Sequence, residues 1–123
     1  MSNSSYDYVI IGAGPAGLSA AATFAKNSIN VVVIDQYQIP GGQYWRHKYG
    51  ANFPAKEFDF LLSSPYVEWK LETSVWQIEA VDGKFLLHIR TAGKTAEIEA
   101  SKLLVATGAI ERSIPFPGWT LPG

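Results

Sequence analysis

The sequence feature that most constrains the fold is the glycine-rich segment Gly12–Gly17, which reads GAGPAG and separates two segments of different character. Residues 6–11 before it are β-branched and aromatic, which predicts a buried strand. Residues 15–26 after it are rich in alanine and predict a helix, because proline suits a first helical position where an N–H would be unpaired anyway. Glycines at GxGxxG spacing allow a tight turn, a close approach of a ligand to the backbone and close packing of helix on strand.

A second strand over 31–35 completes a β-α-β unit, since its first four residues are continuously apolar, as in a parallel strand covered on both faces. Asp35 ends this strand about twenty residues after the glycines, where a carboxylate binds the ribose hydroxyls of a dinucleotide. A pyrophosphate is then expected at the helix N-terminus, where free N–H groups and the helix dipole favour negative charge. The acid argues against NADP, whose 2′-phosphate it would repel. A glycine turn that only packs is the alternative.

The next stretch of the chain predicts a loop, a short helix and a third strand. Residues 36–54 are rich in Gly, Pro, Gln and aromatics without a period, and we expect an ordered loop there. A helix is expected over 55–63, burying Phe58, Leu61 and Leu62. Residues 66–70 are expected to add a parallel strand.

Residues 73–100 alternate between apolar and polar positions and predict a three-stranded antiparallel meander. Asp82-Gly83 and Ala92-Gly93 supply its hairpin turns. One face of the meander is expected to carry the apolar side chains of Trp76, Ile78, Phe85, Leu87, Ala96 and Ile98. His88 is expected on the opposite face, towards solvent. Residues 102–106 then form a last parallel strand. The sequence therefore predicts an α/β, Rossmann-like domain whose parallel sheet is interrupted by a β-meander crossover.

Four motifs make the chain resemble the FAD-binding domain of the FAD-dependent pyridine nucleotide-disulfide oxidoreductases. They are GAGPAG, the segment Pro40–Gln43, the segment Ala106–Gly108, and a tail containing Gly108–Arg112 and Phe116–Trp119. In that superfamily a β-meander replaces the helical crossover of a plain NAD-binding fold. The tail is most similar to the amine-oxidising branch, which includes dye-linked proline dehydrogenase, opine oxidase, hydrogen cyanide synthase and sarcosine oxidase subunits.

The resemblance implies FAD as the cofactor and a set of binding positions along the chain. A cradle for the pyrophosphate is implied at Gly12, Gly14, Pro15, Ala16 and Gly17, and a contact with the adenosine ribose at Asp35. The segment beside the pyrophosphate and the ribityl chain is Gly41, Gly42 and Gln43, and the backbone contact to adenine is at Val75. Thr107 and Gly108 form the turn packed against the cofactor, and Gln36 and Ala106 complete the implied set.

The chain departs from the family pattern in three respects. Asp35 is shorter than the Glu of most relatives, and the absence of cysteine excludes disulfide reduction by this chain. The Gly-Asp segment that closes the sheet in relatives, and a nicotinamide domain, do not follow. We therefore expect residues 1–108 to form an FAD-binding domain without its closing strand. Residues 109–123 are then a Pro- and Gly-rich tail that leads towards an absent NAD(P)-binding or substrate domain.

The segment Tyr44–Tyr49 mixes aromatic rings with positive charge, as sites for single-stranded nucleic acid do. The net charge of −1 and the pI near 6.1 favour no nucleic-acid partner. Two interpretations stay open. The segment covers the flavin side of the cofactor, with Arg46 near phosphate or flavin oxygens, or it is a packed aromatic loop.

Two functions from different classes follow from these residues. The chain is either the FAD-carrying part of an oxidoreductase that oxidises an amine or amino acid or uses NAD(P)H, or a dinucleotide-binding module without activity. The expected partners are FAD and a small substrate or electron acceptor. Self-association is expected through the open sheet edge beside residues 102–106. The lack of cysteine fits a reducing compartment, and we expect the cytoplasm. Glycines interrupt the apolar run Val9–Ala25, so no membrane span is expected.

Overall fold

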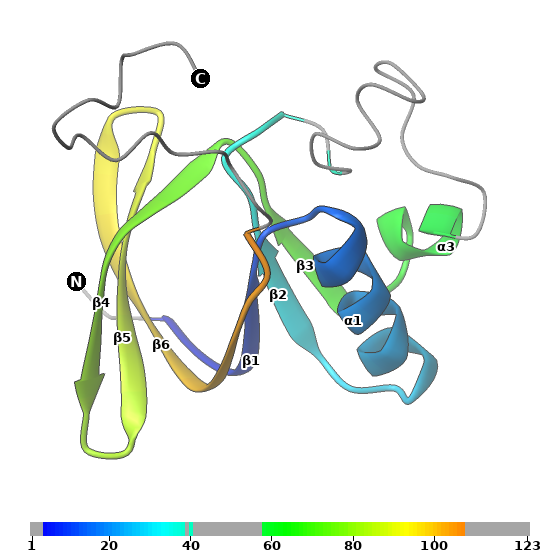
Figure 1. Cartoon of the computed structure of the whole chain (residues 1–123), viewed down its shortest axis with the longest axis horizontal. Helices are drawn as coiled ribbons and strands as arrows, with labels where there is room; N and C mark the ends of the chain where they lie inside the picture. The colour runs from blue at the N-terminus through cyan, green and yellow to red at the C-terminus, as the bar shows by residue number, and fades with distance from the viewer. Residues whose placement is uncertain (1–3, 39, 41–57, 108–123) are drawn as a thin grey trace, which may run out of the picture.

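The computed structural model describes residues 4–38, 40 and 58–107 of the chain (Figure 1). In these ranges, regular structure begins with a strand, a helix and a second strand, continues with a short helix, and ends with a run of strands. The elements are β1 (Ser4–Ile11), α1 (Pro15–Lys26), β2 (Val31–Ile34), α3 (Asp59–Leu62), β3 (Val67–Lys70), β4 (Thr73–Val81), β5 (Lys84–Thr91) and β6 (Lys94–Val105).

The strands form a single six-stranded sheet in the order β3-β2-β1-β6-β5-β4. β1 pairs in parallel with both β2 and β6, and β2 pairs in parallel with β3. β4, β5 and β6 are joined as antiparallel neighbours. The predicted Rossmann-like core and its meander crossover are therefore confirmed.

One predicted boundary is wrong, because residues 94–100 and 102–106 were expected to form separate strands, whereas β6 runs without a break from 94 to 105. β1 begins at Ser4, two residues earlier than predicted, so that its ladder with β6 reaches back to Ile98. Ile98 and Ala100 consequently pair with β5 on one side and with β1 on the other. The meander thus continues the parallel sheet, and both share one curved strand.

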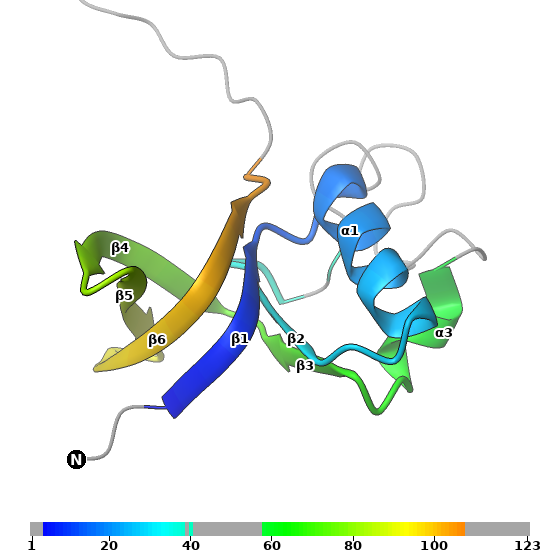
Figure 2. The same ribbon diagram turned by 90° about the horizontal axis from the view of Figure 1, so that it is seen from below.

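The two faces of the sheet carry separate apolar cores. Figures 1 and 2 show α1 and α3 on one side of β1–β3, while the β4–β5 hairpin curls to the other side. The core on the helical side contains Ile10, Ala13, Leu18, Ala21, Ala22, Val31, Val33, Leu61 and Val67. The core on the meander side contains Val9, Ile11, Val32, Ile34, Leu87, Ile89, Ile98 and Ala100.

The short helix α3 is only partly as predicted. Leu61 is fully buried and Phe58 packs against the helical core, but Leu62 is 50% exposed. Successive side chains on a helix point about 100° apart. In this four-residue helix, Leu62 therefore points towards solvent when Leu61 faces α1 and β3. Residues 55–57, where the helix was expected to begin, lie outside the described ranges.

Trp76 also lies on the opposite face from the one predicted, because β4 contains a bulge. Val75 pairs with Ile89 and Gln77 pairs with His88, so Trp76 is an extra residue with no partner opposite. Its side chain is 57% exposed, and its ring centroid lies 5.1 Å from that of His88. His88 is on the outer face, as predicted.

Candidate dinucleotide-binding site

The glycine turn connects the ends of β1, β2 and β6. Gly12 has a φ of 111°, a left-handed conformation that favours glycine. Its N–H donates to the Ile34 carbonyl at 2.7 Å, and the Ala106 N–H donates to the Ile11 carbonyl at 2.7 Å. A Cβ at Gly12 would collide with the Ala106 carbonyl, and one at Gly17 would collide with the Gly12 carbonyl. Both glycines are therefore required for close packing of the turn.

The N-terminus of α1 lies at this turn, and no side chain of the first turn caps it. Gly14 is its cap residue, without a side-chain hydrogen bond, and Pro15 occupies the first turn. No acidic side chain lies in that turn, and the helix is 12 residues long. The first N–H groups of a helix lack partners within it, and the dipole adds partial positive charge there. These residues fit a pyrophosphate group: they provide backbone donors, positive potential and room for its close approach.

Asp35 lies directly after β2, beside the glycine turn, and its side chain is nearly buried, with the residue 9% exposed. Its Oδ1 accepts a hydrogen bond from the Ala13 N–H at 3.0 Å. Its Oδ2 accepts another from the Tyr37 N–H at 3.0 Å. The structure thus brings together the carboxylate and the turn that the sequence indicated, while the ribose contact stays a prediction.

The other predicted site residues are placed as follows. Ala106 and Thr107 follow β6 and lie against Gly12, and Gln36 is exposed next to Asp35. Val75 packs against the meander-side core from β4, and its contact with adenine stays a prediction. The remaining predicted positions lie outside the described residues; they are Gly41, Gly42, Gln43, Arg46 and Gly108. The Tyr44–Tyr49 loop and the tail lie outside them as well.

The junction between β3 and β4 contributes to the site in a way that the sequence did not indicate. The Thr73 N–H donates to the Asp35 carbonyl at 2.9 Å, and the Glu72 N–H donates to the Tyr37 carbonyl at 3.0 Å. Thr73 is buried, and its hydroxyl lies 2.8 Å from that of Thr91. Its one sequence signal is a polar residue in phase with Val75, on the inward-facing side at the start of β4.

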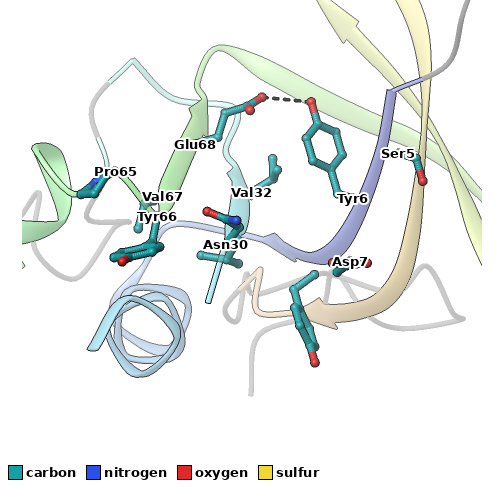
Figure 3. A pocket seen from close by; sticks show the side chains of 11 residues that line it. Ser5, Tyr6, Asp7, Asn30, Val32, Pro65, Tyr66, Val67 and Glu68 are labelled. Carbon is teal, nitrogen blue, oxygen red and sulfur yellow. Dashed lines mark hydrogen bonds between the residues drawn. The ribbon is translucent and has the colours of Figure 1, made fainter. Parts of the chain in front are cut away.

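A pocket of about 340 Å³ lies at the opposite end of the parallel strands (Figure 3). It is lined by residues from the first halves of β1, β2 and β3 and from the segments before β2 and β3. Two of the lining residues are joined by a hydrogen bond, in which the Tyr6 hydroxyl donates to Glu68 Oε2 at 3.0 Å. Lys70, which is not part of the lining, has its Nζ 3.4 Å from the same oxygen. The glycine turn follows the carboxyl end of β1, so this pocket is separate from the dinucleotide site.

No helix within the described ranges combines the length and the apolar character that crossing a membrane requires.

Parallel strands, a glycine turn leading into an uncapped helix and a carboxylate after the second strand together define a dinucleotide-binding α/β domain. The sequence model of the family described as pyridine nucleotide-disulphide oxidoreductase matches residues 6–122, and the chain belongs to this family of FAD-dependent oxidoreductases.

Curated relatives and solved structures agree with this assignment. The chain is 34% identical to an opine oxidase subunit of Agrobacterium tumefaciens, covering 96% of this chain and 27% of the relative. It is also 34% identical to the hydrogen cyanide synthase subunit HcnB of Pseudomonas aeruginosa, covering 94% and 27%. L-proline dehydrogenase from P. horikoshii superposes with a TM-score of 0.71 at 26% identity, covering 93% of this chain and 25% of that one. The chain thus spans about a quarter of the length of these relatives.

Proposed function

We propose that this chain is the FAD-binding part of a flavoprotein that oxidises an amine or an amino acid. The main support for the FAD site is the N-terminus of α1, which no side chain caps, at a turn where Gly12 and Gly17 leave no room for a Cβ. The choice of substrate class rests on the names of the relatives, which include opine oxidase, sarcosine oxidase and L-proline dehydrogenase. Sarcosine and proline are both secondary amines.

In this proposal the chain's own residues bind and orient the cofactor. The N–H groups at the start of α1 hold the pyrophosphate, and Gly14 gives it access to the backbone. Asp35 accepts hydrogen bonds from the adenosine ribose with the lone pairs that its two backbone contacts leave free. FAD, when bound, supplies the ring that accepts the electrons of the substrate.

A second candidate is a dinucleotide-binding module without activity of its own. Its support is that the predicted site residues within the described ranges are all assigned to the cofactor, and none to a substrate.

For the whole protein, NAD(P)H is an alternative electron donor, since thioredoxin reductases are also among the relatives. The chain has no cysteine, so it supplies no thiol pair for such chemistry. We place the protein in the cytoplasm on the same ground.

The test is the visible spectrum of the purified 123-residue chain after incubation with FAD and gel filtration. We expect flavin absorption that co-migrates with the protein, and FAD as the nucleotide released on denaturation. Dye reduction with sarcosine or proline by the full-length protein would then decide between the two candidates. Retention of NADP⁺ in place of FAD would refute the cofactor assignment.

A further inference from the structure

Asp35 uses all four of its hydrogen-bonding groups to join separate segments of the chain. Its N–H donates to the Lys70 carbonyl at 3.0 Å, and its carbonyl accepts from the Thr73 N–H. Its two carboxylate oxygens accept from the Ala13 and Tyr37 N–H groups. One nearly buried residue thus connects the glycine turn, the segment after β2 and the β3–β4 junction.

The carboxylate group is required for this arrangement. Both N–H groups that it receives are backbone donors, and an ionised carboxylate is an acceptor at both oxygens. An asparagine of the same shape would place its NH₂ group against one of the two donors and leave that N–H unpaired. An N–H group left unpaired away from water destabilises the arrangement that it belongs to.

We infer that Asp35 is a positioning residue for the pyrophosphate site and fixes the glycine turn whether or not a ribose is bound. Ala13 lies between Gly12 and Gly14, so the hydrogen bond to its N–H sets the path of the chain as it enters α1. The inference rests on the proposed function for its ligand, because it extends the role of Asp35 beyond contact with ribose hydroxyls.

The first experiment measures the affinity of FAD, and of an FAD analogue with 2′,3′-dideoxyadenosine, for the 123-residue chain and its Asp35→Asn variant. Asp7→Asn is the control, since Asp7 is exposed on β1. We expect Asp35→Asn to weaken both ligands by about ten-fold or more, and the control to weaken neither. A loss confined to FAD, with the analogue bound as tightly as by the unaltered chain, would show a ribose contact alone and overturn the inference.

The main measurement of the second experiment uses the unaltered chain without ligand, so it does not depend on whether a variant folds. Amide hydrogen exchange of the unaltered, ligand-free chain should show slow exchange for the Ala13 and Tyr37 N–H groups, comparable to that within α1. Where Asp35→Asn folds, the amide that faces the introduced NH₂ group, that of Ala13 or of Tyr37, should exchange rapidly while the middle of α1 stays protected, which a general loss of stability would not produce. Rapid exchange at Ala13 in the unaltered chain would overturn the inference. If the chain does not bind FAD, the proposed function fails, and this exchange measurement still decides the role of Asp35.

Discussion

At the residue scale, the two hairpin turns of the meander differ in the conformational strain of their backbone. Asp82 and Ala92 both have a φ near 50°, and each is followed by a glycine at positive φ. Aspartate tolerates this left-handed conformation, whereas alanine has no polar group to compensate for the strain, which is about 1 kcal/mol.

Ala92→Asn is therefore expected to stabilise the chain. Asn-Gly is a favoured pair for such a turn, and we expect the free energy of unfolding to rise by about 0.5–1 kcal/mol. Chemical denaturation followed by circular dichroism measures the change. Ala80→Asn, within β4, is the control and should bring no gain. An equal stability of Ala92→Asn and the unaltered chain would argue against strain at this turn.

Gly14 offers a test of cofactor access that leaves the fold intact. Its φ of −81° and ψ of −169° are extended values that any residue adopts, in contrast to Gly12. Gly14→Leu is expected to abolish retention of FAD, because the side chain blocks the approach of the pyrophosphate to the backbone. Thr23→Leu, on the exposed side of the same helix, is the control. Fluorescence titration measures binding, and a Gly14→Leu variant that still binds FAD would move the site elsewhere.

At the element scale, the outer face of the meander is joined across its three strands by His88. Its Nε2 lies 2.6 Å from Glu79 Oε2 on β4, and its Nδ1 lies 3.4 Å from Glu97 Oε1 on β6. The imidazole is mostly covered, and both glutamates are partly exposed, so solvent weakens each contact. The contact with Trp76 covers the ring further.

We expect His88→Phe to lower the free energy of unfolding by about 0.5–1.5 kcal/mol, because a ring remains beside Trp76 while the hydrogen bond to Glu79 is lost. Glu79→Gln alone should cost less. The double variant should cost less than the two single changes added together, since both remove one interaction. Urea denaturation of the four proteins tests the cycle, and strict additivity would show that the two side chains do not interact.

The same elements show where the sequence was sufficient and where it was not. The β-α-β unit and the meander could be predicted because Gly12–Gly17 and the apolar runs are local patterns. The face of Trp76 could not, because a bulge depends on how β4 pairs with β5. The continuity of β6 depends likewise on β1, which supplies a partner through residues 98–105. At the site, the position of Asp35 was predictable, whereas its bonds to Ala13 and Tyr37 depend on three-dimensional proximity.

At the scale of the whole molecule, the two ends of the parallel sheet have different chemical character. The carboxyl end carries the glycine turn and the N-terminus of α1, which favour an anion. The other end carries the pocket lined by Tyr6 and Glu68, and the Glu68 carboxylate already has a donor in Tyr6 and a cation in Lys70. The cofactor is therefore expected at the carboxyl end alone, in the position usual for open α/β sheets.

The second half of β6 leaves one edge of the sheet open. Pairing with β5 extends only to Ala100, whereas pairing with β1 continues to Val105, so within the described ranges residues 101–105 have a strand on one side only. Leu104 is 43% exposed and Val105 is 59% exposed there. Unpaired backbone groups beside exposed apolar side chains form a template for another strand. The outermost strands of the sheet, β3 and β4, are further edges; β3 has only four residues, and the bulge at Trp76 interrupts β4.

We therefore expect the 123-residue chain to self-associate through the β6 edge at high protein concentration. Sedimentation velocity over a range of concentrations should show a monomer–dimer equilibrium, and Val105→Lys should shift it towards the monomer, because a charge on an edge strand disfavours pairing. Val81→Lys, which puts the same charge at the exposed end of the edge strand β4, is the matched control and should leave the equilibrium unchanged. Loss of the dimer in Val81→Lys alone would assign the contact to β4. If the unaltered chain is a monomer at every concentration, the β6 edge does not pair with a second copy.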